Sequence, residues 1–116
     1  MFTKWLICHE THEKIEKALE SLFDKKNTCL NCYTSCYILN CQENKELRLS
    51  DLAPHLCLSN SATSRLVAKL EQETGFVRRK TCEEDNRGLY VILTEKGQAF
   101  LEEMTPEVNK LLKDLL

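Results

Sequence analysis

Cysteine and histidine are the residues of this 116-residue chain whose type and spacing first suggest chemistry, with seven cysteines and three histidines. Cys29, Cys32 and Cys36 are three and four residues apart, so a helix would place them on one face. Cys8 and His12 are one helical turn apart on an earlier segment. Thiolates and an imidazole from two packed helices can bind zinc tetrahedrally, and four thiolates can hold an iron–sulfur cluster. These five residues are therefore a candidate metal or redox site.

The same cysteines have two further interpretations. Their positions coincide with the apolar seam of the expected helices, where a free cysteine packs as a small hydrophobic side chain. Cys29 and Cys32 also have the Cys-x-x-Cys spacing of thiol oxidoreductases, but no βαβ pattern surrounds them. The odd number of cysteines and a short N-terminal apolar stretch favour a reducing cytoplasm over a secreted disulfide scaffold. Core packing, redox sensing and metal binding stay open, and the sequence requires no cofactor.

Basic residues form a second group of candidate functional residues. Between Ser59 and Cys82 there are five basic and two acidic residues, although the whole chain has a net charge of −2. A helix that begins at Ser59 would expose short hydroxyl and amide groups beside Arg65, which suits the base edges of the DNA major groove. The candidate DNA-binding residues are Ser59, Asn60, Ser61, Thr63, Ser64, Arg65, Lys69, Arg78, Arg79, Lys80 and Arg87.

The expected roles in this basic group differ along the chain. Ser61, Thr63, Ser64 and Arg65 are expected in the major groove, Lys69 and Arg78 on phosphates, and Arg87 in the minor groove. Exposed basic residues are often only solvated, and the basic run 78–80 can simply protect the edge of a sheet. The hydroxyl-rich helix beside a basic hairpin favours DNA contacts.

The elements that would position these residues follow from the spacing of apolar side chains. Spacings of three and four predict helices, and alternation predicts strands. Ser50 and Ser59 are expected N-caps, and Gly75 is an expected helix end. The expected helices are 3–23, 29–41, 51–56, 59–73 and 95–115, the expected strands are 76–80 and 89–93, and a charged flap covers 81–88.

These elements predict one domain over residues 1–116, mainly α with a small antiparallel β-hairpin wing, which is a winged helix-turn-helix. The helix-turn-helix and wing would occupy residues 47–94. The helices at 3–23 and 95–115 carry apolar stripes that need a partner, so we expect them to form a homodimer.

Composition excludes other classes of protein. The chain is 42% hydrophobic and 29% charged with only three Gly and two Pro, which excludes long disordered or collagen-like segments. No apolar run approaches the length of a membrane span, so we expect no membrane partner and a cytoplasmic location. The sequence has no Gly-rich phosphate loop and no Ser/His/Asp pattern, which indicates that the protein is not an enzyme.

Four runs of residues resemble the helix-turn-helix and wing of the MarR family. They are LSDLA at 49–53, LSNSATSRLVAKLE at 58–71, GFVRR at 75–79 and DNRGLYVILTEKG at 85–97. The resemblance covers roughly residues 47–105 and implies a homodimeric transcriptional repressor on a pseudo-palindromic operator in double-stranded DNA, relieved by a small molecule, metal or oxidant. It implies that the recognition helix is 59–71, and that Asp85 braces the wing-tip residue Arg87.

The sequence departs from the family pattern at three places. Cys57 stands where the turn between the two DNA-binding helices usually has a small residue, often Gly, and the helix before Gly75 has one extra residue. The sequence ends at Leu116, where family members normally have a further helix, so the first and last helices are the expected dimer interface.

Two alternative functions follow from the same residues. The first is a redox or metal sensor of the same fold, in which the candidate metal or redox site binds zinc or an iron–sulfur cluster. The second is a winged-helix adaptor that binds other proteins and no DNA. The basic segment 59–82 favours the DNA-binding regulator over this adaptor.

Overall fold

The structure, a computed structural model, describes the backbone of residues 1–82 and 85–116 and the side chains of residues 1–81 and 88–116. The described helices are α1 (Phe2–Asp24), α2 (Leu30–Asn40), α3 (Leu49–Leu56), α4 (Asn60–Lys69) and α5 (Glu95–Leu115), with a 3-10 turn η1 (Glu43–Lys45) and a π-helical turn η2 (Leu70–Thr74). The described strands are β1 (Glu46–Arg48), β2 (Val77–Cys82) and β3 (Asp85–Leu93). The chain divides into two compact units, a first unit of residues 1–30 with 104–116 and a second unit of residues 31–103.

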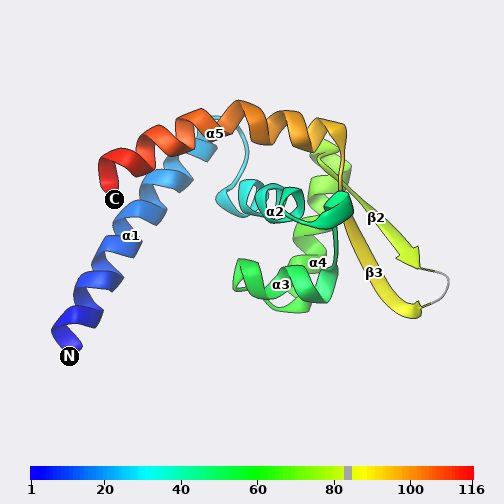
Figure 1. Ribbon diagram of the computed structural model, residues 1–116, viewed down its shortest axis with the longest axis horizontal. Coiled ribbons are helices and arrows are strands. Elements are labelled where there is room, and N and C mark those ends of the chain that lie inside the picture. Colours follow the sequence, from blue (N-terminus) through cyan, green and yellow to red (C-terminus); the bar gives the residue numbers. More distant parts are fainter. Residues whose placement is uncertain (83–84) are drawn as a thin grey trace. The chain divides into compact units, whose positions relative to one another are not determined.

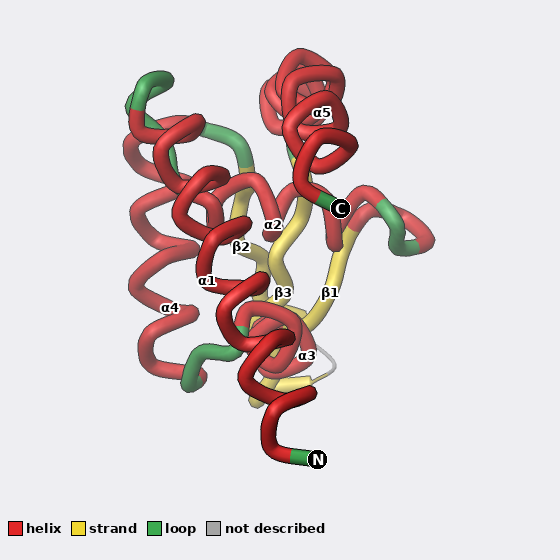
Figure 2. Tube along the Cα trace, turned by 90° about the vertical axis from the view of Figure 1, so that its left-hand side faces the viewer, coloured by secondary structure: helices red, strands yellow, loops and turns green. Residues whose placement is uncertain are grey.

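The second unit contains a three-stranded antiparallel sheet in the order β1-β3-β2, and Figure 2 shows β3 between its two neighbours. Leu47 pairs with Val91, and Val77 pairs with Leu93, so these four side chains share one face of the sheet. Val77, Val91 and Leu93 are buried on that face. Strands β2 and β3 continue beyond the helices as the wing (Figure 1).

Helix α2 is a central element of the second unit, as its apolar character predicts. Its side chains at Cys32, Tyr33, Ser35, Cys36 and Leu39 are buried. The Ser35 hydroxyl donates to the carbonyl of Asn31 at 2.7 Å, so this buried polar group is satisfied within the helix. The Tyr33 ring packs edge-on against Phe100 of α5, with ring centroids 6.3 Å apart.

The first unit contains α1 and the C-terminal part of α5. Phe23 is the one fully buried side chain of α1, while Phe2, Trp5 and Ile7 are exposed over more than half their surface. The Trp5 ring stacks on the His9 ring, with centroids 5.0 Å apart, and on the Phe2 ring. Both of these described ring contacts are made within α1. Helix α1 therefore presents apolar surface to solvent.

The structure confirms a mainly helical winged helix-turn-helix and corrects several boundaries. Ser50 is not an N-cap, because α3 begins at Leu49 with Arg48 in the cap position. The predicted flap at 81–88 is too long, because the strands pair as far as Cys82 and Asp85. Strand β1 was not predicted, and it extends the expected hairpin to a three-stranded sheet. None of the helices in the described part of the chain has the length and apolar character needed to cross a bilayer.

The extra residue before Gly75 has a structural explanation. The helix that begins at Asn60 leaves α-helical geometry after Lys69 and ends in the π-helical turn η2, rather than continuing in α-helical form to the predicted end at 71–73. The Gly75 N–H donates to the carbonyl of Leu70 at 2.9 Å, five residues back instead of four. A π turn accommodates one additional residue without displacing the rest of a helix.

Candidate nucleic-acid interface

The turn between α3 and α4 sets the geometry of the candidate interface. Cys57 has φ 56° and ψ 37°, which is the left-handed region. Its N–H donates to the carbonyl of Pro54 at 3.1 Å, and the N–H of Leu58 donates to that of Ala53 at 3.2 Å. These bonds satisfy the last carbonyls of α3. A residue with a Cβ is strained there by about 1–2 kcal/mol, which explains why a small residue was expected at this position.

Ser59 begins α4 as the sequence predicts. Its hydroxyl oxygen accepts a hydrogen bond from the N–H of Ala62 at 3.1 Å, which is N-cap geometry. Thr63 and Val67 are fully buried, and Leu70 continues the same stripe. Helix α3 packs beside α4, and its own apolar side chains Leu52 and Leu56 are buried. The buried stripe fixes which side of α4 is left to solvent.

Thr63 is a correction to the candidate DNA-binding residues. Its side chain has 0% exposure, and its hydroxyl donates to the carbonyl of Ser59 at 2.8 Å. A buried hydroxyl that is satisfied inside its own helix cannot reach a base edge. Thr63 therefore stabilises the start of α4 and is wrong as a base-reading residue.

The solvent-facing side of α4 carries polar and basic groups. Asn60, Ser61, Arg65 and Lys69 are exposed, and Ser64 is half-buried beside them. Helical spacing places Ser61, Arg65 and Lys69 on the side opposite Thr63 and Val67, while Asn60 is exposed at the first turn and Ser64 lies at the edge of the buried stripe. This side presents a hydroxyl and two cations on one continuous surface, with the Asn60 amide at the start of the helix, and these groups are complementary to base edges and phosphates.

The two faces of β2 separate the basic residues of the wing. Arg78 and Lys80 are exposed and share one face, because they pair with Ile92 and Tyr90 of β3. Arg79 points to the opposite face, where its Nε and one terminal nitrogen both lie 2.9 Å from Oε1 of Glu71. The Arg79 N–H also donates to Oε2 of Glu71 at 2.7 Å. Arg79 therefore ties the wing to the end of the recognition helix.

Glu71 is a functional partner that sequence reasoning missed. The hydrogen bond from the Arg79 backbone N–H, followed by the side-chain bond from Arg79, lowers the pKa of Glu71 below its usual value. The carboxylate is consequently held in its charged form as the acceptor of three donor groups. The available signal was weak, because Glu71 is one of two carboxylates in the basic segment 59–82 and residue type alone does not separate it from Glu73.

Arg48 is a second residue that the sequence did not indicate. Its Nε donates to the hydroxyl of Tyr90 at 3.2 Å, and its guanidinium carbon lies 5.6 Å from the centre of the Tyr90 ring. The strand register aligns Arg48, Tyr90 and Lys80 across the sheet. On the exposed face of the sheet, Arg48 of β1 therefore lies beside the wing residues Arg78 and Lys80.

The base of the wing is held by Thr94 and Gly97. The Thr94 hydroxyl donates to the carbonyl of Gly75 at 2.6 Å and accepts from the N–H of Gly97 at 3.1 Å, so it caps α5. A Cβ at Gly97 would lie 2.2 Å from the carbonyl oxygen of Phe76. Only glycine allows this approach between α5 and the start of β2. The side chains of Asp85 and Arg87 lie outside the described residues, so their predicted roles stay predictions.

The cysteines have distinct environments. Cys29 and Cys32 are disulfide-bonded, so in this state they offer no thiolate to a metal. Burial raises the pKa of the Cys36 thiol to about 12, which keeps it protonated and suits core packing. Cys8 is exposed, and His12 lies 3.7 Å from Glu16 on the same helix. Within the described residues, no three potential metal ligands form a group, and the metal or redox site stays a prediction.

Comparisons with known proteins agree with this geometry. Residues 37–89 match the family model described as MarR family. AbsC, a MarR family transcriptional regulator from Streptomyces coelicolor, superposes with a TM-score of 0.89 at 27% identity, covering 98% of this chain and 76% of its own. Over residues 37–89, and in its fold, the chain is similar to MarR family regulators. The MarR-type regulator Sco3205 from the same organism, whose structure is a complex with DNA, has a TM-score of 0.89 at 26% identity and covers 98% and 71% of the two chains.

A curated relative is a transcriptional repressor that is longer than this chain. The transcriptional repressor MprA of Escherichia coli K12 is 27% identical over 109 residues, which is 94% of this chain. The chain spans 61% of the length of MprA. MprA and AbsC are both transcriptional regulators by name.

Proposed function

We propose that this protein is a transcriptional regulator, acting as a repressor, that binds double-stranded DNA through α4 and the wing. The observation that carries the proposal is the exposed polar and basic side of α4, formed by Ser61, Arg65 and Lys69, with Asn60 exposed at the start of the helix. It is supported by the sheet beside it, where Arg48, Arg78 and Lys80 are exposed on one face. The likeness to Sco3205, solved with DNA, supports the same assignment. The proposal includes a cytoplasmic location and an effector that relieves DNA binding.

Each exposed residue has a separate role in this proposal. Arg65 has the planar fork that pairs with guanine in the major groove, and Ser61 and Asn60 are short enough to approach neighbouring base edges. Lys69 and Arg78 contact phosphates, which contribute affinity without sequence information. Arg87 is assigned to the minor groove from its place in the family motif. Thr63 and Arg79 have structural roles, as their burial and ion pair indicate.

The test begins by selecting a duplex from a pool with a randomised central segment and measuring its affinity by fluorescence anisotropy. Arg65→Ala is expected to weaken binding to the selected duplex about 5- to 150-fold, the range for one bidentate base contact. Arg65→Lys keeps the charge and is expected to retain binding to random duplexes while losing preference for the selected one. Lys110→Ala, an exposed α5 residue, is the control. Equal affinity for Arg65→Ala and wild type would overturn the role of α4.

The wing assignment has its own test. Arg87→Ala and Lys69→Ala are each expected to weaken binding to all duplexes and to flatten the salt dependence by about one unit, because each removes one positive charge from the DNA interface. Unchanged affinity of Arg87→Ala at fixed salt would remove the wing tip from the interface. Selection that recovers no duplex, with no retention on heparin at low salt, would favour a protein-binding adaptor instead.

The proposal also includes a homodimer formed by the first unit. Phe2 and Trp5 are 70% and 56% exposed, stack on each other and share one side of α1, so this side presents aromatic surface that a partner can cover. A second copy presents the same surface, as a two-fold interface requires. Light-scattering mass, measured with and without reductant, is expected to give twice the mass of one chain under both conditions. A monomer at micromolar concentration would contradict this part of the proposal.

A further inference from the structure

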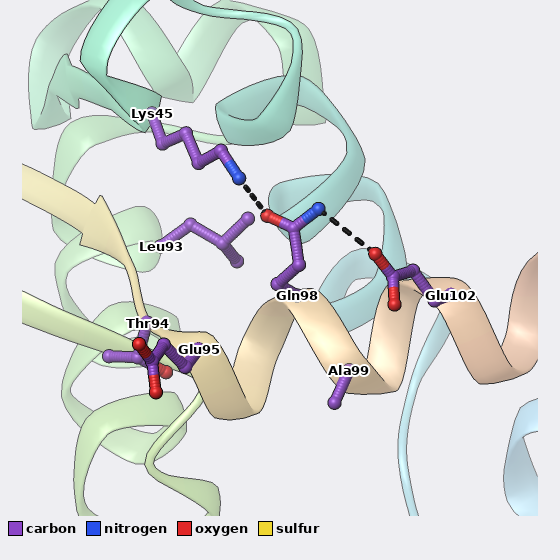
Figure 3. A pocket seen from close by; sticks show the side chains of 7 residues that line it. All are labelled: Lys45, Leu93, Thr94, Glu95, Gln98, Ala99 and Glu102. Carbon is purple, nitrogen blue, oxygen red and sulfur yellow. Dashed lines mark hydrogen bonds between the residues drawn. The ribbon is translucent and has the colours of Figure 1, made fainter.

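A cavity in the second unit lies apart from α4 and the wing tip. Its volume is about 360 Å³, near the lower end of the range for small-molecule sites. The turn before β1, the end of β3 and the first two turns of α5 surround it (Figure 3). The lining residues are Lys45, Leu93, Thr94, Glu95, Gln98, Ala99 and Glu102.

The Lys45 ammonium and the Glu102 carboxylate line this cavity, and the Gln98 amide bonds to both. The Lys45 ammonium donates to Oε1 of Gln98, and Nε2 of Gln98 donates to Oε1 of Glu102 at 3.3 Å. Figure 3 shows the Gln98 side chain between the other two, with its oxygen toward Lys45 and its nitrogen toward Glu102. The cavity therefore offers a cationic donor at one position and an anionic acceptor at another.

A tight backbone turn sets the direction in which the Lys45 side chain leaves the chain. Asn44 and Lys45 have φ of 61° and 55°, a left-handed conformation that residues other than glycine seldom adopt. The Lys45 N–H donates to the carbonyl of Gln42 at 3.1 Å, which closes the turn. The acidic position lies on α5, where Glu95 and Glu102 are two turns apart and flank Gln98. Leu93 and Ala99 add apolar surface to the lining.

The Gln98 amide indicates which ligand would fit. The amide oxygen of Gln98 accepts from Lys45, and its amide nitrogen donates to Glu102. This oxygen and nitrogen are bonded to the same carbon. A free α-amino acid carries a carboxylate acceptor and an ammonium donor on adjacent carbons, so it presents the same pair with full charges. Charge-assisted hydrogen bonds are stronger than those of a neutral amide. A zwitterion can therefore replace the amide, whereas a simple anion or a simple amine would satisfy only one position.

We propose that this cavity binds a free α-amino acid with a small apolar side chain, its carboxylate on Lys45 and its ammonium on Glu102. The Gln98 side chain swings away and the apolar side chain of the ligand lies against Leu93 and Ala99. Because Lys45 and Glu102 are exposed, water competes for both and the dissociation constant is on the order of 1 mM. Binding uses none of the residues assigned to DNA, so the two proposals stand or fall separately.

The test is a titration of the full chain with L-valine, followed through the side-chain amide resonances of Gln98. L-Valine is expected to shift these resonances and to saturate, because it displaces the amide. Isobutylamine and isovalerate, which are valine without its carboxylate and without its ammonium, are expected to leave them in place at the same concentration. No shift with L-valine, or equal shifts with either analogue, would overturn the proposal.

Variants separate binding from a merely structural effect. Lys45→Met and Glu102→Gln are expected to weaken L-valine binding about fivefold or more, measured by calorimetry, whereas Lys110→Met and Glu103→Gln leave it unchanged. Gln98→Ala removes the competing amide and is expected to strengthen binding about two- to fivefold. Loss of binding in Gln98→Ala, or full binding in the Lys45→Met and Glu102→Gln double variant, would overturn the proposed pose.

Discussion

Helices α4 and α5 begin at side chains that accept hydrogen bonds, Ser59 and Thr94, whereas α1 begins without a side-chain cap. The first turn of α1 has no acidic residue and its last turn has no basic one, so its ends do not complement the helix dipole. The second unit is thus held by local hydrogen bonds and a buried core. The first unit depends on what covers the apolar surface of α1.

This difference between the two units separates two kinds of requirement. The proposed DNA-reading surface needs a rigid support, because base contacts depend on side chains held in one geometry. Helix α1 needs an apolar partner, since a helix in water is stabilised mainly by packing. Changes in the second unit should therefore alter stability, and changes on the exposed face of α1 should alter assembly.

The largest expected effect comes from Gly97. A methyl group there would meet the carbonyl of Phe76 at 2.2 Å, so Gly97→Ala must move α5 away from the wing. The free energy of unfolding is expected to fall by about 3 kcal/mol. Urea unfolding at neutral pH measures it.

Gly75→Ala is the matched control for Gly97→Ala. A Cβ at Gly75 meets only the Lys96 side chain at 3.5 Å, but φ is +72°, so the same substitution is expected to cost only about 1 kcal/mol. Equal losses for the two variants would contradict the close approach at Gly97.

The next effect concerns assembly and tests the first unit. Trp5→Glu places a charge on the proposed interface and is expected to weaken the dimer about 30-fold or more, since a buried aromatic often contributes at least 2 kcal/mol. Its stability as a monomer should change little, because Trp5 is 56% exposed. Sedimentation velocity over a concentration series measures the change. Ser21→Glu, on the opposite side of α1, is the control, and a dimer equally weakened by both variants would argue against a specific interface.

A smaller effect is expected at Glu71 and should depend on pH. Glu71→Gln is expected to lower the free energy of unfolding by about 1 kcal/mol at pH 7, because the bonds from Arg79 lose their charged acceptor. Since the folded state lowers the pKa of Glu71, its stabilisation is present above the ordinary pKa of glutamate and is lost as pH falls through the lowered value. Urea unfolding from pH 7 to pH 3 should show the two proteins converging in acid. Glu73→Gln, on the same turn but exposed, should show no such pattern. A difference that persists in acid would argue against the ion pair.

The smallest effect is a gain in stability at Cys57. Cys57→Gly relieves a left-handed residue that carries a Cβ and is expected to raise the free energy of unfolding by about 1 kcal/mol. Thermal and urea unfolding measure it. Cys41→Gly, at an exposed cysteine whose φ is not positive, should be neutral or destabilising. A loss of stability in Cys57→Gly would show that the turn is not strained.

The sequence predicted those parts of the interface that depend on local patterns. The cap at Ser59, the stop at Gly75 and the alternation at 89–93 are properties of neighbouring residues, and the structure has all three. Strand β1 was missed because Glu46–Arg48 has a single apolar residue and is defined by pairing with Tyr90–Ile92, more than forty residues away. The ion pair between Glu71 and Arg79 was also missed, because it joins the end of a helix to a strand and depends on how the chain turns between them.

Thr63 shows a different limit of sequence reasoning. Its residue type resembles that of the exposed hydroxyls at Ser61 and Ser64, so type alone placed it with the DNA-binding residues. Its spacing from Val67 and Leu70 indicated the buried stripe, and the structure confirms that side. Where residue type and helical periodicity disagree, periodicity decides what a side chain can reach.

The central claim is that the exposed side of α4, together with the wing, is an electrostatic and base-reading surface for DNA. The most direct measurement is the salt dependence of affinity for the selected duplex. With Arg48, Arg65, Lys69, Arg78 and Lys80 exposed on each chain and Arg87 assigned to the interface, the logarithm of the association constant should fall with the logarithm of salt concentration, with a slope of about −5 per protomer. A slope near zero, or no binding to DNA at low salt, would contradict the account.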